Sequence, residues 1–272
     1  MEHWKLEDVA WSAFEPEKVD PDMLKLAKAA SLVEYNAGDY AEYLKHVFHD
    51  DPEFQSAAVI WAAEEVQHGK ALARWARMAD PEFDFEKCFK RFTDKIKLPI
   101  GTEHSVRGSR TGELIARCII EVGTSSYYSA LAGAAEEPVM REICTRIAAD
   151  EIRHFKLFCR TMERYQPAER PGLIARVRIV LDRLSETDDD ELAYAYYVAN
   201  HDGDGPFERD VFGNAYKSRA YSYYHHWHVQ RMVAMTFKAI GLKPTGLLSR
   251  LMARIGFATM RRRVRRSSAA SI

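Results

Sequence analysis

The sequence predicts an all-α protein built around a bundle of four long helices, with further helices at its C-terminal end. Apolar residues recur at helical spacing through most of the 272 residues, and almost no segment shows the strict alternation of a strand. Acidic residues followed by proline divide the chain into helix-length segments. A seven-residue element that contains glutamate and histidine occurs twice, which indicates a duplicated helical unit.

The first two bundle helices are separated by a clear boundary. Asp20-Pro21 opens the first helix, because aspartate is a good N-cap and proline fits the first turn. The segment His49-Asp50-Asp51-Pro52 ends this helix and starts the second, which extends to about residue 79. A short helix is expected near residues 85–95, before a loop.

The third and fourth bundle helices are expected at about 111–135 and 138–165, joined by the turn Glu136-Glu137-Pro138. Four further helices are expected at 170–186, 189–200, 207–240 and 245–264. The chain would therefore divide into a bundle over residues 18–166 and C-terminal helices packed on it over 167–272, with a basic tail from about residue 258.

Composition and charge exclude several classes of protein. The formal net charge is −1, so no overall field favours nucleic acid as a partner. The first residues are acidic and lack a signal peptide's basic start and apolar run, and no apolar run of 18 residues exists. The four cysteines, Cys88, Cys118, Cys144 and Cys159, form no C-x-x-C pair. We expect a cytoplasmic protein with reduced thiols.

The duplicated element carries the chemistry. Residues 62–68 and 148–154 both read A-A-acid-E-x-x-H, and only His68 and His154 among ten histidines follow a glutamate by three residues. Residues three apart lie on one face of a helix, so Glu65 can act with His68, and Glu151 with His154, on a shared ion. Two such elements plus one glutamate from each of two other helices form the ligand set of carboxylate-bridged di-iron bundles.

The two remaining glutamates follow from the turns. In an antiparallel helix pair, residues at equal height are equally far from the connecting turn. The midpoint of Glu34 and Glu65 falls between residues 49 and 50, in the first turn. The midpoint of Glu121 and Glu151 is residue 136, in the second turn. Glu34 and Glu121 also lie beside apolar runs, where burial of a carboxylate is costly unless it is paired or metal-bound.

The expected site therefore holds two iron ions. Its ligands would be Glu34, Glu65, His68, Glu121, Glu151 and His154. Four carboxylates and two imidazoles suit iron or manganese better than structural zinc. The opposing interpretation is that the acids are surface charges and the histidines packed core residues. Glu64 and Asp150 would accept hydrogen bonds from the far ring nitrogens of the ligand histidines, with a solvated helix charge as the alternative for Glu64.

Two segments resemble a known family. Residues 61–69 read WAAEEVQHG, which resembles the W-x-A-E-E-x-x-H-G element of the soluble acyl-ACP desaturases, and residues 147–154 are similar to their I-A-x-D-E-x-x-H element. Thr124 stands where that family carries a threonine beside its oxygen site. The resemblance implies a ferritin-like fold, O2-dependent desaturation of an acyl chain on acyl carrier protein, and a catalytic role for Thr124. It also implies a homodimer and a small electron donor such as ferredoxin.

Other ferritin-like proteins fit less well. Ribonucleotide reductase radical subunits carry a tyrosine where this chain has Leu72, and arylamine N-oxygenases carry a ligand histidine where it has Ile147. The cysteines cannot form the extra four-cysteine iron site of rubrerythrins. Ferritins are little more than the bundle, whereas this chain continues for about a hundred residues past it. Two alternatives stay open: a di-iron hydroxylase acting on another small apolar substrate, and an iron-binding ferroxidase without an organic substrate.

The C-terminal segment has three interpretations. An apolar helix is followed by a dense basic stretch containing Arg261, Arg262, Arg263, Arg265 and Arg266. This segment could contact a membrane surface as a peripheral helix or dock an acidic acyl carrier protein. The third interpretation is a solvated chain end.

Overall fold

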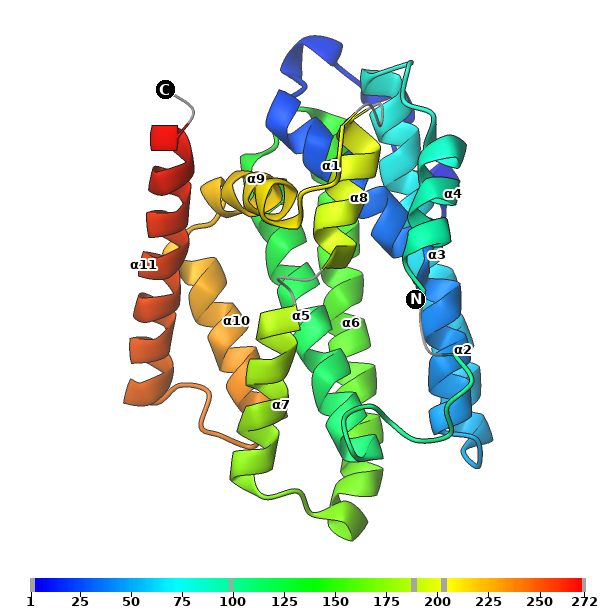
Figure 1. Cartoon of the computed structure of the whole chain (residues 1–272), viewed down its shortest axis with the longest axis vertical. Helices are drawn as coiled ribbons and strands as arrows, with labels where there is room; N and C mark the ends of the chain where they lie inside the picture. The colour runs from blue at the N-terminus through cyan, green and yellow to red at the C-terminus, as the bar shows by residue number, and fades with distance from the viewer. Residues whose placement is uncertain (1–2, 98–99, 187–189, 202–204, 271–272) are drawn as a thin grey trace.

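The structure is a computed structural model that describes residues 3–97, 100–186, 190–201 and 205–270 (Figure 1). All regular secondary structure in these ranges is helical, which confirms the predicted fold class. Three short 3-10 helices come first: η1 (Leu6–Asp8), η2 (Trp11–Ala13) and η3 (Pro16–Lys18). The α-helices are α1 (Pro21–Tyr35), α2 (Ala37–Val47), α3 (Pro52–Ala79), α4 (Phe85–Lys95), α5 (Arg110–Ala134), α6 (Pro138–Glu169), α7 (Leu173–Glu186), α8 (Asp190–Asn200), α9 (Arg209–Ser222), α10 (His226–Ala239) and α11 (Leu247–Ala270).

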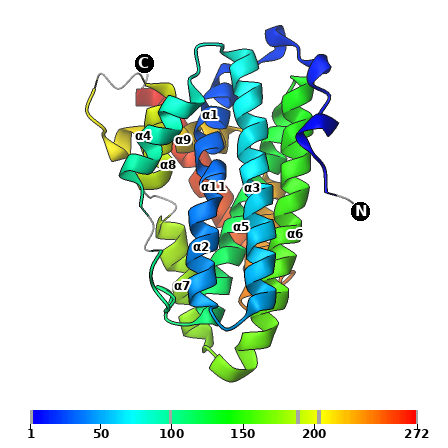
Figure 2. The same ribbon diagram turned by 90° about the vertical axis from the view of Figure 1, so that its right-hand side faces the viewer.

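Four antiparallel columns form the bundle. Helices α1 and α2 follow one another in the first column, and α3, α5 and α6 form the others (Figures 1 and 2). Helix α5 packs against α6, α3 packs against α1, α2 and α6, and the later helices cover the side of this core formed by α1 and α5 (Figure 1). Helices α7 and α10 pack on α5, α8 packs on α1, and α11 packs on α9 and α10. Within the described ranges, no helix is long and apolar enough to cross a bilayer.

Side-chain caps fix where the bundle helices begin. The carboxylates of Asp20 and Asp51 accept hydrogen bonds from backbone N–H groups in the first turns of α1 and α3. Ser109 caps α5 in the same way. Glu137 accepts two N–H groups of α6 and also the indole N–H of Trp75, at 2.7 Å. These caps satisfy donors that a helix start leaves open, so local sequence is enough to place the boundaries.

Three helices differ from the predicted pattern. The expected first helix is broken at Asn36 into α1 and α2, since Asn36 and Gly38 are weak helix formers. The segment 207–240 forms two helices because the His228 ring accepts the backbone N–H of His225, at 2.9 Å, and the chain turns there. Helix α11 continues to Ala270 because arginine favours helix and no breaker follows.

A polar layer lies between two apolar clusters of the bundle. On α3, residues up to Ala62 belong to one cluster, and residues from Ala71 onward belong to the other. On α6, the change occurs between Ala148 and Phe155. The interval left on each helix holds one copy of the repeated Glu-x-x-His element. The fold therefore places both copies at one height, with apolar side chains on either side of them.

Candidate metal centre

The structure brings all six candidate ligands together. They form two overlapping groups: Glu34, Glu65, His68 and Glu151 in one, and Glu65, Glu121, Glu151 and His154 in the other. Within each group the potential ligand atoms lie within 4.8 Å of one another. Glu65 and Glu151 belong to both groups. Every column of the bundle contributes at least one carboxylate, so the site exists only when the four columns are packed.

Both histidines turn their Nδ1 atoms toward the carboxylates. His68 Nδ1 lies 3.0 Å from Glu65 Oε2 and 3.4 Å from Glu151 Oε1. His154 Nδ1 lies 3.1 Å from Glu65 Oε1 and 3.6 Å from Glu121 Oε2. The contact between His68 and Glu65 is within α3 and follows from their i, i+3 spacing. The other three contacts join different helices.

The far ring nitrogens have acidic partners across the bundle. His68 Nε2 lies 3.0 Å from Asp150 Oδ2, and His154 Nε2 lies 2.7 Å from Glu64 Oε2. Arg153 bridges the two acids, with Nη2 at 2.6 Å from Asp150 and 3.2 Å from Glu64. Burial raises the pKa of both acids, but the hydrogen bonds from the histidines and Arg153 outweigh it and leave both pKa values lowered. Ionised acids at these positions hold each Nε2 as the donor and leave Nδ1 facing the site.

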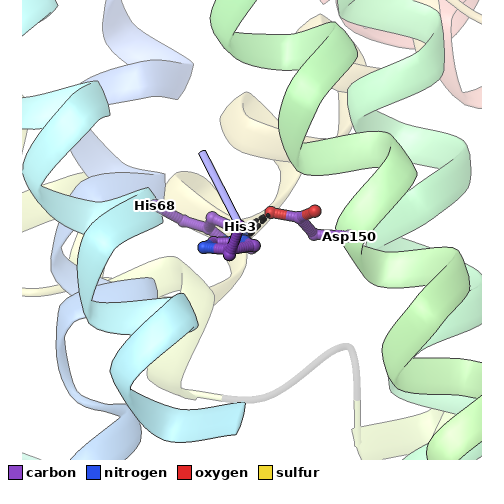
Figure 3. A group of neighbouring side chains, drawn as sticks. All are labelled: His3, His68 and Asp150. Carbon is purple, nitrogen blue, oxygen red and sulfur yellow. Dashed lines mark hydrogen bonds and ion pairs between the residues drawn. The ribbon is translucent and has the colours of Figure 1, made fainter. Parts of the chain in front are cut away.

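The N-terminal segment adds two residues that the sequence did not indicate. Asp150 Oδ2 lies 2.8 Å from His3 Nε2 and accepts the Trp4 indole N–H at 2.6 Å. The Trp4 ring stacks on His68, with centroids 6.0 Å apart and planes 7° apart. Figure 3 shows His3 and His68 meeting the same Asp150 carboxylate. Asp150 Oδ2 thus accepts hydrogen bonds from three nitrogen atoms. We therefore interpret His3, His68 and Asp150 as a hydrogen-bonded group and not as a further metal site.

Two hydroxyl groups of α5 contact the central carboxylates. Thr124 Oγ1 donates to Glu151 Oε2 at 2.7 Å. The Tyr128 hydroxyl donates to Glu34 Oε1, and burial together with this carboxylate raises the pKa of Tyr128 well above its usual value. Tyr128 follows Glu121 by seven residues, two helical turns, so spacing alone could have identified it. No comparable signal exists for His3 and Trp4, which lie far from both motifs in the sequence.

Protons balance the charge of the metal-free cluster. Burial, and then the neighbouring carboxylates, raise the pKa values of Glu34 and Glu121 well above the usual range. Burial alone would lower the pKa values of His68 and His154, but the surrounding acids raise both well above 6.5. The same histidines outweigh burial and lower the pKa values of Glu65 and Glu151, so the ionised pair faces protonated imidazoles and the charges offset one another.

Buried polar atoms that make no hydrogen bond test whether these residues fit metal ions. Both carboxylate oxygens of Glu121, Glu151 Oε1 and His154 Nδ1 are buried and make no hydrogen bond, although the last two lie 3.4 Å and 3.1 Å from His68 Nδ1 and Glu65 Oε1. Leaving such groups unpaired costs about 1–3 kcal/mol each. All four atoms belong to the group formed by Glu65, Glu121, Glu151 and His154. Carboxylate oxygen and imidazole nitrogen are ligand atoms that iron accepts. The residues present therefore fit a pair of metal ions.

Comparison with known proteins identifies a family for this chain. A family model described as fatty acid desaturase matches residues 40–183, which is 144 of the 272 residues. The match includes five of the six candidate ligands. The sixth, Glu34, lies six residues before the first matched residue. A search among curated proteins found no match. The family match confirms the resemblance seen in the two motifs, and the chain belongs to the fatty acid desaturase family.

Proposed function

We propose that the protein is a di-iron oxidase that uses O2 to introduce a double bond into a fatty-acyl chain held on acyl carrier protein. The observation that carries the proposal is the pair of ligand groups, buried except for the partly exposed Glu34, that share Glu65 and Glu151. A site for two metals with two shared carboxylates is the arrangement of di-iron bundles. Membership of the fatty acid desaturase family supports an acyl substrate and oxidation as the reaction class.

Glu34, Glu65, His68, Glu121, Glu151 and His154 would hold the two irons, with Glu65 and Glu151 contributing to both. Bound iron would supply the redox chemistry, activating O2 for removal of hydrogen from an unactivated C–H bond. Desaturation provides two of the four electrons that reduce O2 to water. The other two must come from a donor, so the proposal includes a small electron-transfer protein such as ferredoxin.

The protein's own groups hold this site in one arrangement. Asp150 and Glu64 fix the orientation and tautomer of the two histidines. The Thr124 hydroxyl, 2.7 Å from Glu151 Oε2, is placed to hold or pass a proton beside that carboxylate. The apolar clusters on either side of the polar layer would limit the access of water, and electrostatic interactions are stronger in such surroundings.

Product analysis tests the proposal directly. Protein reconstituted with iron, reduced and exposed to O2 with acyl-carrier substrates should yield acyl chains that have lost two hydrogens, measured by mass spectrometry. Acyl chains that gain one oxygen would instead identify a hydroxylase. Iron oxidation that leaves every acyl chain unchanged would identify a ferroxidase.

Metal analysis tests the site separately. Wild-type protein should bind about two irons per chain. His154→Ala should lose at least one iron while its circular dichroism stays helical. His46→Ala, on the half-exposed outer side of α2, is the matched control and should keep both ions. Wild-type protein that binds no iron after anaerobic reconstitution would refute the assignment.

A further inference from the structure

Helix α11 exposes an apolar face to solvent. It lies at the edge of the molecule, with α9 and α10 packed against one side (Figure 1). Ser249 and Ala253 are buried on that side, and Phe257 packs into the apolar cluster there. The opposite side presents large apolar side chains, from 43% to 83% exposed: Leu247, Leu248, Leu251, Met252 and Ile255. A contiguous exposed patch of this kind marks an interaction surface.

The same helix carries a concentrated positive charge. Its sequence contains seven arginines and no acidic residue: Arg250, Arg254, Arg261, Arg262, Arg263, Arg265 and Arg266. Since the whole chain has a net charge of −1, the remainder of the protein carries a net charge of −8. This peripheral helix therefore has a local excess of positive charge, whereas the rest of the molecule has a net negative charge.

The arginines border the apolar face in a regular line. At 100° per residue, Arg250, Arg254, Arg261 and Arg265 project from one side of the helix. Leu251 and Ile255 project from the adjacent side, away from the buried residues. The helix thus has a protein-facing side, an apolar side and an arginine border. Long arginine side chains at such a border can keep their charged ends at a polar boundary while the apolar side is buried.

We infer that α11 binds the surface of a membrane rich in anionic lipid. Helices that lie in the membrane interface combine a basic face with exposed leucine-like residues, and clusters of four to eight arginines or lysines attract anionic head groups. Because its apolar side runs along the helix next to the arginine border, α11 would lie along the surface with its axis parallel to the membrane. The inference does not depend on the metal centre.

Two other occupants fit this surface less well. In a symmetric dimer the same patch meets itself, which would bring together two helices that each carry seven arginines and no acidic residue, and like charges repel. An acidic acyl carrier protein would match the arginines but offers no reason for five large apolar side chains beside them. An anionic bilayer satisfies both features at once.

Vesicle flotation with the full-length protein tests the inference. Vesicles of phosphatidylcholine containing about one third phosphatidylglycerol should retain the protein at least about tenfold better than pure phosphatidylcholine vesicles, less so at high salt. Leu251→Glu with Ile255→Glu should lower retention by about tenfold, because charge opposes burial of the apolar side. Arg261→Gln with Arg265→Gln should lower retention similarly and weaken the salt dependence.

Ile60→Glu is the matched control, because Ile60 is 62% exposed and belongs to α3, a helix on the other side of the bundle from α11 (Figure 1). It should bind vesicles as wild type does, and circular dichroism should show every variant folded. Equal retention of wild type and the Leu251→Glu, Ile255→Glu variant would overturn the inference. So would a wild type that ignores anionic vesicles but binds an acidic carrier protein, or one that dimerises through α11 without binding vesicles.

Discussion

At the scale of single residues, the side chains around the six candidate ligands decide how the site behaves. Asp150, Glu64, Thr124 and Tyr128 each hydrogen-bond one candidate ligand and do not belong to the six themselves. Their effect is to fix a ring, a tautomer or a carboxylate oxygen in place. Substitutions here should alter the reaction while leaving the fold and the ligand set intact.

Thr124 offers the sharpest test at this scale. Thr124→Val keeps the shape of the side chain but removes the hydroxyl that contacts Glu151. We expect the variant to bind iron normally and to form about tenfold less product per O2 consumed, since a positioned proton donor is lost. Oxygen uptake and product are measured together. Thr124→Ser should restore coupling, and a valine variant as well coupled as wild type would remove Thr124 from the mechanism.

The cysteines should differ in reactivity. A hydrogen bond from the Cys118 thiol, with Sγ atoms 3.5 Å apart, lowers the pKa of the half-buried Cys159. Burial instead raises the pKa of Cys88, and Cys144 is fully buried. Because the thiolate is the reactive form, iodoacetamide should modify Cys159 before Cys88 at mildly alkaline pH.

Peptide mass spectrometry measures the order of modification. Cys118→Ala should slow labelling of Cys159 by removing the hydrogen bond, whereas Cys144→Ala should leave the rate unchanged. Faster labelling of Cys88 than of Cys159 would contradict the prediction.

At the scale of helices, one glycine sets how closely α1 and α3 approach. A Cβ atom on Gly69 would lie 2.7 Å from Tyr35 N and 2.9 Å from Ser31 O, both backbone atoms of α1. These helices carry Glu34 and Glu65, so their spacing also sets the distance between two candidate ligands. A small residue is required here because backbone, unlike a flexible side chain, cannot move aside locally.

Gly69→Ala should therefore lower the free energy of unfolding by about 1–3 kcal/mol, because overpacking forces the helices apart. It should also weaken iron binding. Gly133→Ala is the control: no atom lies within 4 Å of its added Cβ, so the gain in helix propensity should stabilise α5 by up to about 1 kcal/mol. Urea denaturation measures both. Equal stability of the two variants would show that α1 and α3 are not in tight contact.

At the scale of the whole molecule, the fold holds a charged layer inside an apolar bundle. Two apolar clusters border it. Burial raises the pKa values of Glu34 and Glu121 and favours their protonated forms, whereas the histidines outweigh burial and lower the pKa values of Glu65 and Glu151. Metal binding and proton binding are therefore coupled, and the stability of the bundle must depend on pH differently with and without metal.

Metal-free protein should lose stability as the pH rises above about 6.5, the ordinary histidine value. The pKa values of His68 and His154 are higher in the folded than in the unfolded protein. Their contribution to stability is therefore complete below the pKa of the unfolded state and is lost as the pH rises through the pKa of the folded state. Glu34 and Glu121 act in the same direction from a lower starting pH. Iron requires deprotonated ligands, so its affinity should increase over the same range.

Calorimetry of chelator-treated and anaerobically iron-loaded protein measures the effect. The difference between their Tm values should widen with increasing pH, and a His68→Ala variant should show a smaller widening. A difference that is constant or narrows above pH 6.5 would contradict the proton balance described for the cluster.

The sequence by itself determined the helical class, most helix starts and the set of six candidate ligands. These depend on local chemistry: acidic caps before prolines, apolar spacing along one face, and glutamate three residues before histidine. Even the pairing of Glu34 with Glu65 followed from counting residues on either side of a turn, because helix rise is constant. The structure places all six in two adjoining groups.

Only the tertiary structure decided which distant segments complete the site. Nothing in the spacing placed His3 and Trp4 on Asp150, more than 140 residues away along the chain, since that contact depends on how the N-terminal segment crosses the bundle. The break at Asn36 and the exposure of the apolar side of α11 were likewise hidden. Periodicity shows which residues share a face of a helix, but which faces are covered depends on packing between segments far apart in sequence.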